Sequence, residues 1–290
     1  PAARALGKAF FATSGGSGAH NWQPMSFDPR TGLVYLPVQQ FAQAYARDDH
    51  FVFRPDLWNT GLAFAMPTTA ADMEILRRPP SGALIAWDPV RRRPAWTVTH
   101  QTAWNGGALA TAGGLVFQGL DDQTFRAFRA DTGAEVWRMA VKAPVQPAAI
   151  SYRVGATQYV AVTAGVGGGI ALAMPAMAGP KVWAPARVLV FKLGGTATLS
   201  ETPGSVPPLQ QVNASFAPAQ VAQGQGLFGQ FCTVCHGANT MSAGELPDLK
   251  RSGMLPDAES WKQVVVGGAL ESQGMASFAN YLSPDQAEAI

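Results

Sequence analysis

The chain has 290 residues, of which 47% are hydrophobic and 14% are charged, and its formal net charge is +2. This composition predicts a globular chain with a large core, long enough for one large and one small domain. The net charge is too small to predict nucleic-acid binding, and no apolar run is long enough to predict a transmembrane segment.

The N-terminal part of the chain contains a repeated pattern of strand, turn and strand. Asp88 and Trp96 align with Asp131 and Trp137, and each pair spans a turn between strand-like runs. The repeat distance of about 40 residues is typical of a β-propeller blade, and residues 1–195 would then form four or five blades. The alternative is an antiparallel sandwich that contains two similar hairpins.

Further strands and turns extend this all-β pattern. The 31 Gly and 22 Pro residues indicate many turns. A related Asp-Pro-x-Thr-Gly turn occupies residues 28–32, and further strands are predicted within 113–119, 158–165 and 186–195.

A change of composition predicts a domain boundary. Residues 196–215 are polar, rich in Pro and without periodicity, which predicts a linker. The linker separates a β-rich domain at 1–195 from a small helical domain at 216–290. Because residue 1 is Pro and residue 290 lies within a helical pattern, we expect both ends to be cuts in a longer protein, with the second domain truncated at its C-terminus.

Both cysteines of the chain lie in one motif, Cys232-Thr-Val-Cys235-His236. A zinc site usually needs four ligands, and no second cysteine pair exists. A redox dithiol needs the same cysteine spacing but no following His. Covalent attachment of haem c uses all three residues, with two thioether bonds and His236 as an axial ligand of the iron. We therefore predict a haem c site, with a redox dithiol or a chance pair of cysteines as the remaining alternatives.

A c-type haem needs a second axial ligand, commonly Met or His. No His follows His236, and we favour Met275 over Met254 as the ligand. Residues 215–231 predict a leading helix, and Ser283, followed by Pro284 and Asp285, predicts the N-terminus of a final helix. A haem motif on a first helix, a ligand Met in a loop and a packed final helix resemble a small class I cytochrome c.

Four segments are specific in combination. They are GGSGAHNWQPMSFDPRTGLVYLPVQ (15–39), WNGGALATAGGLVFQG (104–119), QYVAVTAGVGGG (158–169) and the haem motif. Over essentially the whole chain they resemble the C-terminal half of the type II quinohaemoprotein alcohol dehydrogenases. The resemblance implies the last blades of an eight-bladed propeller that holds pyrroloquinoline quinone (PQQ) and Ca²⁺, followed by a fused cytochrome c.

The resemblance also implies which residues contact PQQ. Asn21 and Trp22 match an Asn-Trp pair that contacts the quinone, and Ala164 matches a residue whose backbone approaches it. An amide can donate to the quinone or accept from it, and an indole offers an N–H and a flat face. Val166 stands where many relatives carry Trp, so we expect a different pocket shape. Trp104 faces either the cofactor or a neighbouring blade.

No catalytic residue is assigned to this chain. In the family, the general-base Asp, the Ca²⁺ ligands and a Lys or Arg near the quinone precede the segments that match here. The acid pairs Asp48-Asp49 and Asp121-Asp122 are predicted to be solvated loops, and the basic run 91–93 a solvated turn.

The resemblance implies a periplasmic enzyme that oxidises primary or secondary alcohols, with aldehydes as the products from primary alcohols. Electrons would pass one at a time to haem c and then to an external acceptor, such as a blue copper protein or a cytochrome. The 290 residues alone are expected to be inactive.

Two alternatives stay open. One is the dehydrogenase subunit of a membrane-associated type III alcohol dehydrogenase, which an exposed apolar docking patch would favour. The other is an electron-transfer cytochrome on a non-catalytic propeller scaffold, in which the missing N-terminal portion would lack the base and the Ca²⁺ ligands.

Overall fold

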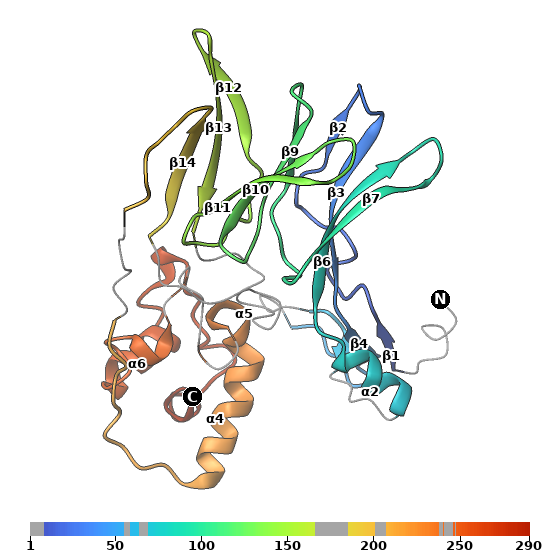
Figure 1. Ribbon diagram of the computed structural model, residues 1–290. Coiled ribbons are helices and arrows are strands. Elements are labelled where there is room, and N and C mark those ends of the chain that lie inside the picture. Colours follow the sequence, from blue (N-terminus) through green and yellow to red (C-terminus); the bar gives the residue numbers. More distant parts are fainter. Residues whose placement is uncertain are drawn as a thin grey trace. The chain divides into compact units, whose positions relative to one another are not determined.

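The computed structural model describes residues 9–54, 59–63, 69–165, 185–200, 207–237, 240, 246 and 248–290. These residues form two compact units: a β-rich unit up to residue 200 and a helical unit from residue 207 (Figure 1). The structure confirms the predicted order, in which an all-β part is followed by a small all-α part.

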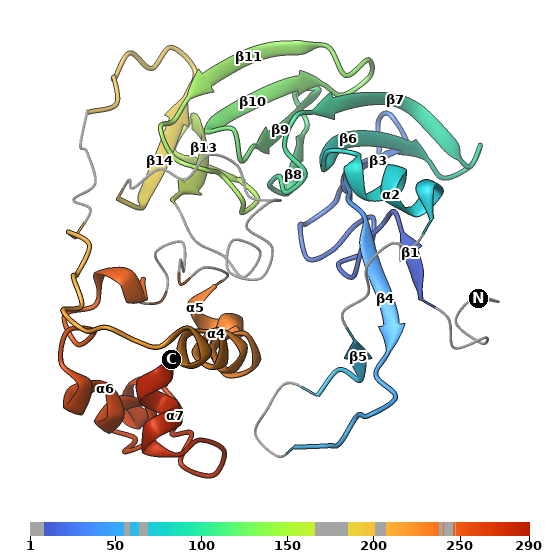
Figure 2. The same ribbon diagram turned by 90° about the horizontal axis from the view of Figure 1, so that it is seen from below.

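Three antiparallel sheets form most of the β-rich unit. The first blade has the order β2 (Ser26–Asp28), β3 (Leu33–Gln40), β6 (Ser81–Asp88), β7 (Arg93–His100). The second blade has the order β8 (Ala108–Thr111), β9 (Leu115–Gly119), β10 (Thr124–Arg129), β11 (Glu135–Ala140). The third sheet has the order β12 (Ile150–Val154), β13 (Thr157–Ala164), β14 (Arg187–Lys192). Figure 2 shows the second blade between the other two sheets.

The sequence repeat corresponds to a structural repeat. Asp88 and Asp131 both begin the hairpin between the third and fourth strands of a blade, and Trp96 and Trp137 both lie in the fourth strand. The blades lie side by side as in a propeller, so the sandwich alternative is wrong. The described residues form fewer blades than the expected four or five, because an insertion at 41–80 interrupts the first blade.

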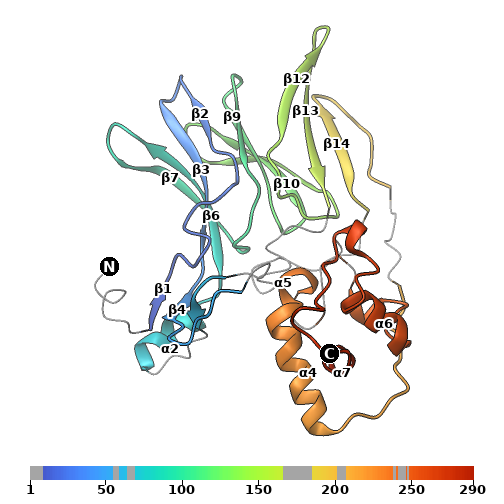
Figure 3. The same cartoon turned by 180° about the vertical axis from the view of Figure 1, so that it is seen from behind.

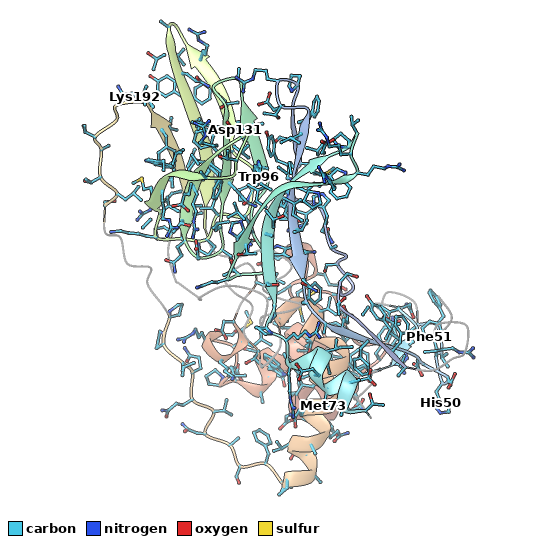
Figure 4. All side chains as sticks on the ribbon, turned by 45° about the vertical axis from the view of Figure 1, so that its right-hand side comes forward. His50, Phe51, Met73, Trp96, Asp131 and Lys192 are labelled. Carbon is cyan, nitrogen blue, oxygen red and sulfur yellow. The ribbon has the colours of Figure 1, made fainter. Side chains whose placement is uncertain are left out.

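The insertion forms a small sheet together with a strand from the start of the described chain. Strands β1 (Phe10–Ala12), β4 (Gln43–Arg47) and β5 (Leu62–Ala63) make a three-stranded sheet in that order, and α2 (Ala70–Arg77) follows. Thr69 caps α2 by accepting a hydrogen bond from the Asp72 backbone N–H. Figure 4 shows Phe51 on the segment between β4 and β5, away from the blades.

One residue of the second blade anchors two aromatic side chains of the first. The Ala130 carbonyl accepts hydrogen bonds of 3.0 Å from both Trp96 Nε1 and the Tyr35 hydroxyl. Trp96 also covers Gly133, where an added Cβ would lie 2.6 Å from Trp96 Cε3. Figure 4 shows Trp96 beside the turn that carries Asp131. The first two blades are thus held together at the ends that carry these hairpins.

Arg30 adds a second contact between the blades at the same ends. It belongs to the predicted 28–32 turn, which joins β2 to β3. Its guanidinium pairs with Asp28 at 2.9 Å and donates to the carbonyls of Thr111 and Ala112. Donation from Arg30 holds the pKa of Asp28 below its ordinary value.

Six short or medium elements lie among the described residues of the helical unit. They are α4 (Pro218–Phe231), α5 (Thr233–His236), η2 (Leu249–Arg251), α6 (Ala258–Val265), η3 (Glu271–Gln273) and α7 (Pro284–Ala289). Ser283 caps α7 in a reciprocal capping box, and Pro284 occupies its first turn, as predicted. Among the helices that the structure describes, none is both long and apolar enough to cross a membrane.

The core of the helical unit lies where α4, α6 and α7 meet (Figure 3). Its fully buried members are Val265, Leu282 and Ala287. Phe231, at the end of α4, packs against Phe278 and Tyr281, with ring centroids 5.9 and 6.1 Å apart. The only buried residue of α4 is Gly224, where an added Cβ would lie 1.7 Å from Ala289 O. Glycine therefore permits the close approach of α4 and α7.

We expect Gly133→Ala to destabilise the β-rich unit more than Gly155→Ala. Both glycines have positive φ angles, 74° and 58°, so each alanine costs about 1 kcal/mol of left-handed strain. Only Gly133 is covered by Trp96, which adds about 1–3 kcal/mol of overpacking. Urea unfolding followed by tryptophan fluorescence would measure both free energies. Equal losses would show that Trp96 does not lock the blades.

Two glycines of α4 give a matched test of the helix contact. Gly224→Ala should lower the free energy of unfolding of the helical unit by about 2 kcal/mol or more, because the methyl group meets backbone atoms. Gly226→Ala should raise it by about 0.5–1 kcal/mol, because Gly226 is exposed with open space around it and alanine favours the helix. Thermal unfolding followed at 222 nm would separate them, and a stabilised Gly224→Ala variant would contradict the α4–α7 packing.

Candidate functional site

The three sheets bring several loops together on one face, here called the site face. It lies at the ends where the first strand of each sheet begins and the second strand ends. Ala108 N donates to Pro24 O at 2.9 Å and so joins these ends of the first and second blades. A Cβ added at Gly107 would lie 2.7 Å from Pro24 Cδ and 2.8 Å from Ala148 Cβ, just before the third sheet. The packing here leaves room only for glycine.

Asn21 and Trp22 lie on the site face, in the loop before β2, and both are exposed. Asn21 Nδ2 donates to Ser17 O, and Asn21 Oδ1 accepts from Trp22 N, both at 2.8 Å. The amide keeps one hydrogen and one lone pair for a ligand. The Trp22 side chain is 53% exposed, so a large flat surface is open beside that amide. This arrangement fits a planar cofactor with carbonyl and N–H groups.

Ala164 is the last residue of β13 and also lies on the site face. Its side chain is buried, and its neighbour Gly165 donates from its backbone N to Pro144 O at 2.9 Å. Only the backbone of Ala164 could therefore meet a ligand, which is the contact that the resemblance implies. Val166 lies outside the described residues.

Most of the buried polar side chains that the structure describes gather beneath the site face. Six of the nine are Gln23, Gln39, His100, Asn105, Gln118 and Asp121. Sequence reasoning missed all six of these roles, and it named Asp121 only as a solvated loop residue. The residues form short chains of hydrogen bonds that hold loops in place, so this face is supported by polar contacts as well as by apolar packing.

His100 and Gln118 hold the loop that contains Gly106. Gln118 Nε2 donates to Gly106 O at 2.9 Å, so its Oε1 is the acceptor that faces His100 Nε2 at 3.0 Å. His100 therefore carries its proton on Nε2. Burial lowers the pKa of His100 to about 4, which keeps the ring neutral at neutral pH. Trp104, in the same loop, is buried, which favours packing between blades over cofactor contact.

Asp121 is not the solvated loop residue that the sequence predicts. It is 1% exposed, and its Oδ1 accepts a hydrogen bond from Gln146 at 3.2 Å. Burial raises its pKa to about 6. The prediction was wrong because the following Asp122 reaches Arg126, while the loop turns Asp121 inward.

The other charged stretches behave as predicted. Asp49 is exposed and pairs with exposed Arg47 at 3.1 Å, and the partly exposed Asp48 accepts from His50 N. The basic run 91–93 is exposed, and Arg91 pairs with Asp88 at 2.7 Å. Neither stretch contains a buried acid that could act as a base.

The predicted haem residues form one helical turn at the end of α4. Cys235 N and His236 N donate to Cys232 O at 3.2 and 2.9 Å. The spacing places both sulfurs and the imidazole on one side of the turn. Cys232 and His236 are buried, Cys235 is exposed, and both thiols are free. The geometry fits two thioether bonds and one axial ligand.

The alternatives for the cysteines are weaker. Burial raises the pKa of the Cys232 thiol to about 11, whereas a redox dithiol needs a low thiol pKa. Among the described residues, no group of three or more His, Cys, Asp or Glu could hold a metal ion. The turn therefore favours covalent haem.

The two candidate methionines differ in exposure. Met254 is 37% exposed and follows η2, while Met275 is partly buried and follows Gly274, whose φ of 92° ends η3. Phe278 N donates to Val265 O at 2.8 Å and holds the loop of Met275 against α6. The preference for Met275 stays a prediction, supported by its burial and its fixed loop.

Two protein families match different parts of the chain. Residues 65–160 match "Glucose/ethanol/alcohol dehydrogenase, beta-propeller domain", and residues 219–290 match "Cytochrome C oxidase, cbb3-type, subunit III". The chain is 40% identical to quinohemoprotein alcohol dehydrogenase ADH IIB of Pseudomonas putida, over 94% of this chain and 39% of that protein. It is 33% identical to the dehydrogenase subunit of alcohol dehydrogenase (quinone) of Komagataeibacter europaeus, over 98% of this chain and 39% of that subunit.

Solved structures agree in fold. Quinohemoprotein alcohol dehydrogenase ADHIIG of Pseudomonas putida HK5 superposes with a TM-score of 0.82 at 37% identity, covering 98% of this chain and 42% of that one. The quinohemoprotein alcohol dehydrogenase of Comamonas testosteroni superposes with a TM-score of 0.76 at 35% identity, covering 99% of this chain and 42% of that one. This chain thus spans about 40% of the length of the curated relatives it matches.

The fold and the cysteine turn define a partial dehydrogenase-type β-propeller followed by a cytochrome c domain. Over the part that it spans, the chain is a homologue of the PQQ-dependent quinohaemoprotein alcohol dehydrogenases, and the resemblance read from the sequence is confirmed.

Asp121→Asn should stabilise the protein at neutral pH. The folded-state pKa of Asp121, about 6, lies above the ordinary 3.8, so the wild type loses stability as the pH rises between these values. Above pH 6 the free energy of unfolding of the variant should exceed that of the wild type by on the order of 3 kcal/mol. Below pH 4 the two free energies should agree. Urea unfolding of both proteins at pH 4, 5, 6 and 8 would measure how this difference in free energy depends on pH.

Asp131→Asn is the control with the opposite sign. Donation from Arg129 lowers the pKa of the exposed Asp131, so its variant should gain no stability at pH 8. An Asp121→Asn difference that does not vary with pH would contradict the burial of an ionisable Asp121.

Proposed function

We propose that the protein containing this chain oxidises alcohols with bound PQQ and Ca²⁺ and passes the electrons to a covalently attached haem c. One observation supports this most directly: a dehydrogenase-type propeller and a Cys-x-x-Cys-His turn with a buried His236 occur in one chain. The 290 residues alone are expected to be inactive, because no general base is assigned among them.

Three residues of the site face would hold PQQ. Asn21 would hydrogen-bond the quinone with its remaining amide hydrogen or lone pair, Trp22 would cover its face, and the backbone of Ala164 would approach it. When bound, PQQ supplies a two-electron acceptor and Ca²⁺ a Lewis acid. The Ca²⁺ ligands and the base that takes the alcohol proton are expected upstream of this chain.

The helical unit would hold the haem. Cys232 and Cys235 would form the thioethers, and His236 and Met275 would be the axial ligands, a pair that gives a high potential. Conversion of an alcohol to an aldehyde releases two electrons and two protons, and a single haem accepts one electron at a time. The electrons would therefore leave in two steps, toward an external blue copper protein or cytochrome.

The proposal extends to domains and location. We assign 1–195 to the propeller, 196–215 to a linker and 216–290 to the cytochrome domain. Leu199 packs against the propeller core, and Gln210 N donates to Lys250 O at 2.8 Å, so residues near both ends of this linker contact a domain. The proposed haem attachment and the resemblance both support a periplasmic location.

A second candidate is the dehydrogenase subunit of a membrane-associated alcohol dehydrogenase. Phe51, Val52 and Phe53 are exposed together between β4 and β5, and relatives named as dehydrogenase subunits match nearly the whole chain. The complete protein should then sediment with membranes, whereas the periplasmic enzyme should stay in the supernatant.

Alcohol-driven reduction of the haem would test the main proposal. The complete protein, matured with haem and supplied with PQQ and Ca²⁺, should show the reduced α-band after addition of ethanol or 1-butanol. Omitting PQQ should abolish this response while dithionite still reduces the haem.

A second experiment tests the covalent attachment of the haem. The wild type should show an α-band in alkaline pyridine that survives acid-acetone extraction. The double variant Cys232→Ala/Cys235→Ala should lose this band.

Two outcomes would contradict the proposal. Colour that acid-acetone removes completely would show that the cysteines do not bind haem covalently. The second outcome is a covalent haem that dithionite reduces but that neither alcohol reduces when PQQ is bound. It would favour the electron-transfer cytochrome on a non-catalytic scaffold.

A further inference from the structure

The loop that carries Asn21 and Trp22 is fastened to the end of β3. Phe41 N donates to Thr13 O at 3.1 Å, and Gln39 N donates to Ala19 O at 2.9 Å. The loop bends through Gly15 and Gly18, whose φ angles are 58° and 73°. These backbone contacts fix the beginning and the middle of the loop, and the bond from Ala108 N to Pro24 O fixes its end.

The Gln39 side chain fills the inside of this loop. It is 4% exposed, and its Nε2 donates to Ser17 O at 3.2 Å and to Gly18 O at 3.1 Å. Its Oε1 accepts from Gln23 Nε2 at 3.4 Å. Both amide hydrogens and the amide oxygen are thus used to hold residues on the two sides of Asn21 and Trp22.

A chain of contacts leads from Gln39 to the proposed cofactor residues. Ser17 O accepts from Gln39 and, at 2.8 Å, also from Asn21 Nδ2. Asn21 Oδ1 then accepts from Trp22 N. The Trp22 indole has no hydrogen bond or ring contact among the described residues, so its place depends on its own backbone.

Gln23 depends on Gln39 in the same way. It directly follows Trp22 and is 3% exposed. Its buried Oε1 has no donor among the described residues, and its Nε2 is held by Gln39. Loss of Gln39 would leave a second buried amide unsatisfied beside Trp22, which favours movement of this segment.

We propose that Gln39 is a positioning residue for cofactor binding, acting through Ser17 on Asn21 and through Gln23 on Trp22. The inference rests on the proposed function, because it presumes that Asn21 and Trp22 contact PQQ. Gln39 itself is 4% exposed and lies beneath the loop, so it would act through its neighbours and not by direct contact with the cofactor. Its effect is to keep an exposed amide and an exposed indole in one arrangement before the cofactor binds.

Gln39→Met tests this in the complete protein. Methionine is close to glutamine in size but offers none of its hydrogen bonds. The dissociation constant for PQQ is measured by titration of the apoprotein in the presence of Ca²⁺, and the stability of the apoprotein by thermal unfolding. We expect PQQ binding to weaken about tenfold or more, as the loss of one well-placed contact would produce.

Tyr35→Phe is the matched control on the same strand. Tyr35 is fully buried, and its hydroxyl bonds Ala130 O and Thr31 Oγ1 at the end of β3 away from the loop. Both variants should lower the melting temperature of the apoprotein, but only Gln39→Met should weaken PQQ binding. An unchanged dissociation constant in Gln39→Met, with stability lost as in Tyr35→Phe, would overturn the proposal.

A double variant tests the route through Asn21. Asn21→Ala should weaken PQQ binding, and adding Gln39→Met should weaken it by less than the product of the two single effects, because both act on Asn21. Independent effects would contradict the route. If Gln39→Met does not fold, Gln39→Asn replaces it, since its shorter amide cannot reach both carbonyls. A wild type that binds no PQQ would instead contradict the proposed function.

Discussion

The arrangement of the propeller blades depends on the carbonyl of Ala130. It accepts hydrogen bonds from Trp96 and Tyr35, two side chains of the neighbouring blade, and Gly133 beside it leaves space for the indole. This contact lies at the hairpin ends of the blades, opposite the site face. At the site face, Pro24 and Gly107 make the second point of contact. Two sheets joined at both ends are restrained in their tilt, and the contact of Pro24 with Gly107 and Ala108 holds the spacing of the loops at the site face itself.

The site face is held by buried amides as well as by apolar packing. At the ends of β3 and β9, Gln39 and Gln118 point inward and bond the carbonyls of nearby loops. A loop that crosses the end of a sheet has backbone groups that no strand can satisfy, and a buried amide can satisfy two of them. Neutral His100 completes this layer without adding charge. The loops are thus fixed while their outer surfaces stay available.

Local signals made much of this structure predictable from the sequence. The repeated Asp and Trp positions predicted the blades, the Cys-x-x-Cys-His spacing predicted the helical turn, and Ser283 predicted the last helix. The burial of Asp121 was not predictable, because two adjacent acids in a turn resemble a solvated loop. Gln39 left a weak signal: in β3 it has the same parity as the buried Leu33 and Tyr35. Its partners lie about twenty residues away, and only the folded loop brings them together.

Two buried titratable groups beneath the site face, His100 and Asp121, constrain how this face responds to pH. His100 is neutral above about pH 4, and Asp121 is neutral below about pH 6. Stability from neutral His100 is lost as the pH falls from 6.5 toward 4, whereas the cost of charged Asp121 appears as the pH rises from 3.8 toward 6. The two effects oppose each other over the same range. The layer beneath the site face is therefore fully neutral only between about pH 4 and 6, and above that range Asp121 places a buried negative charge beneath it.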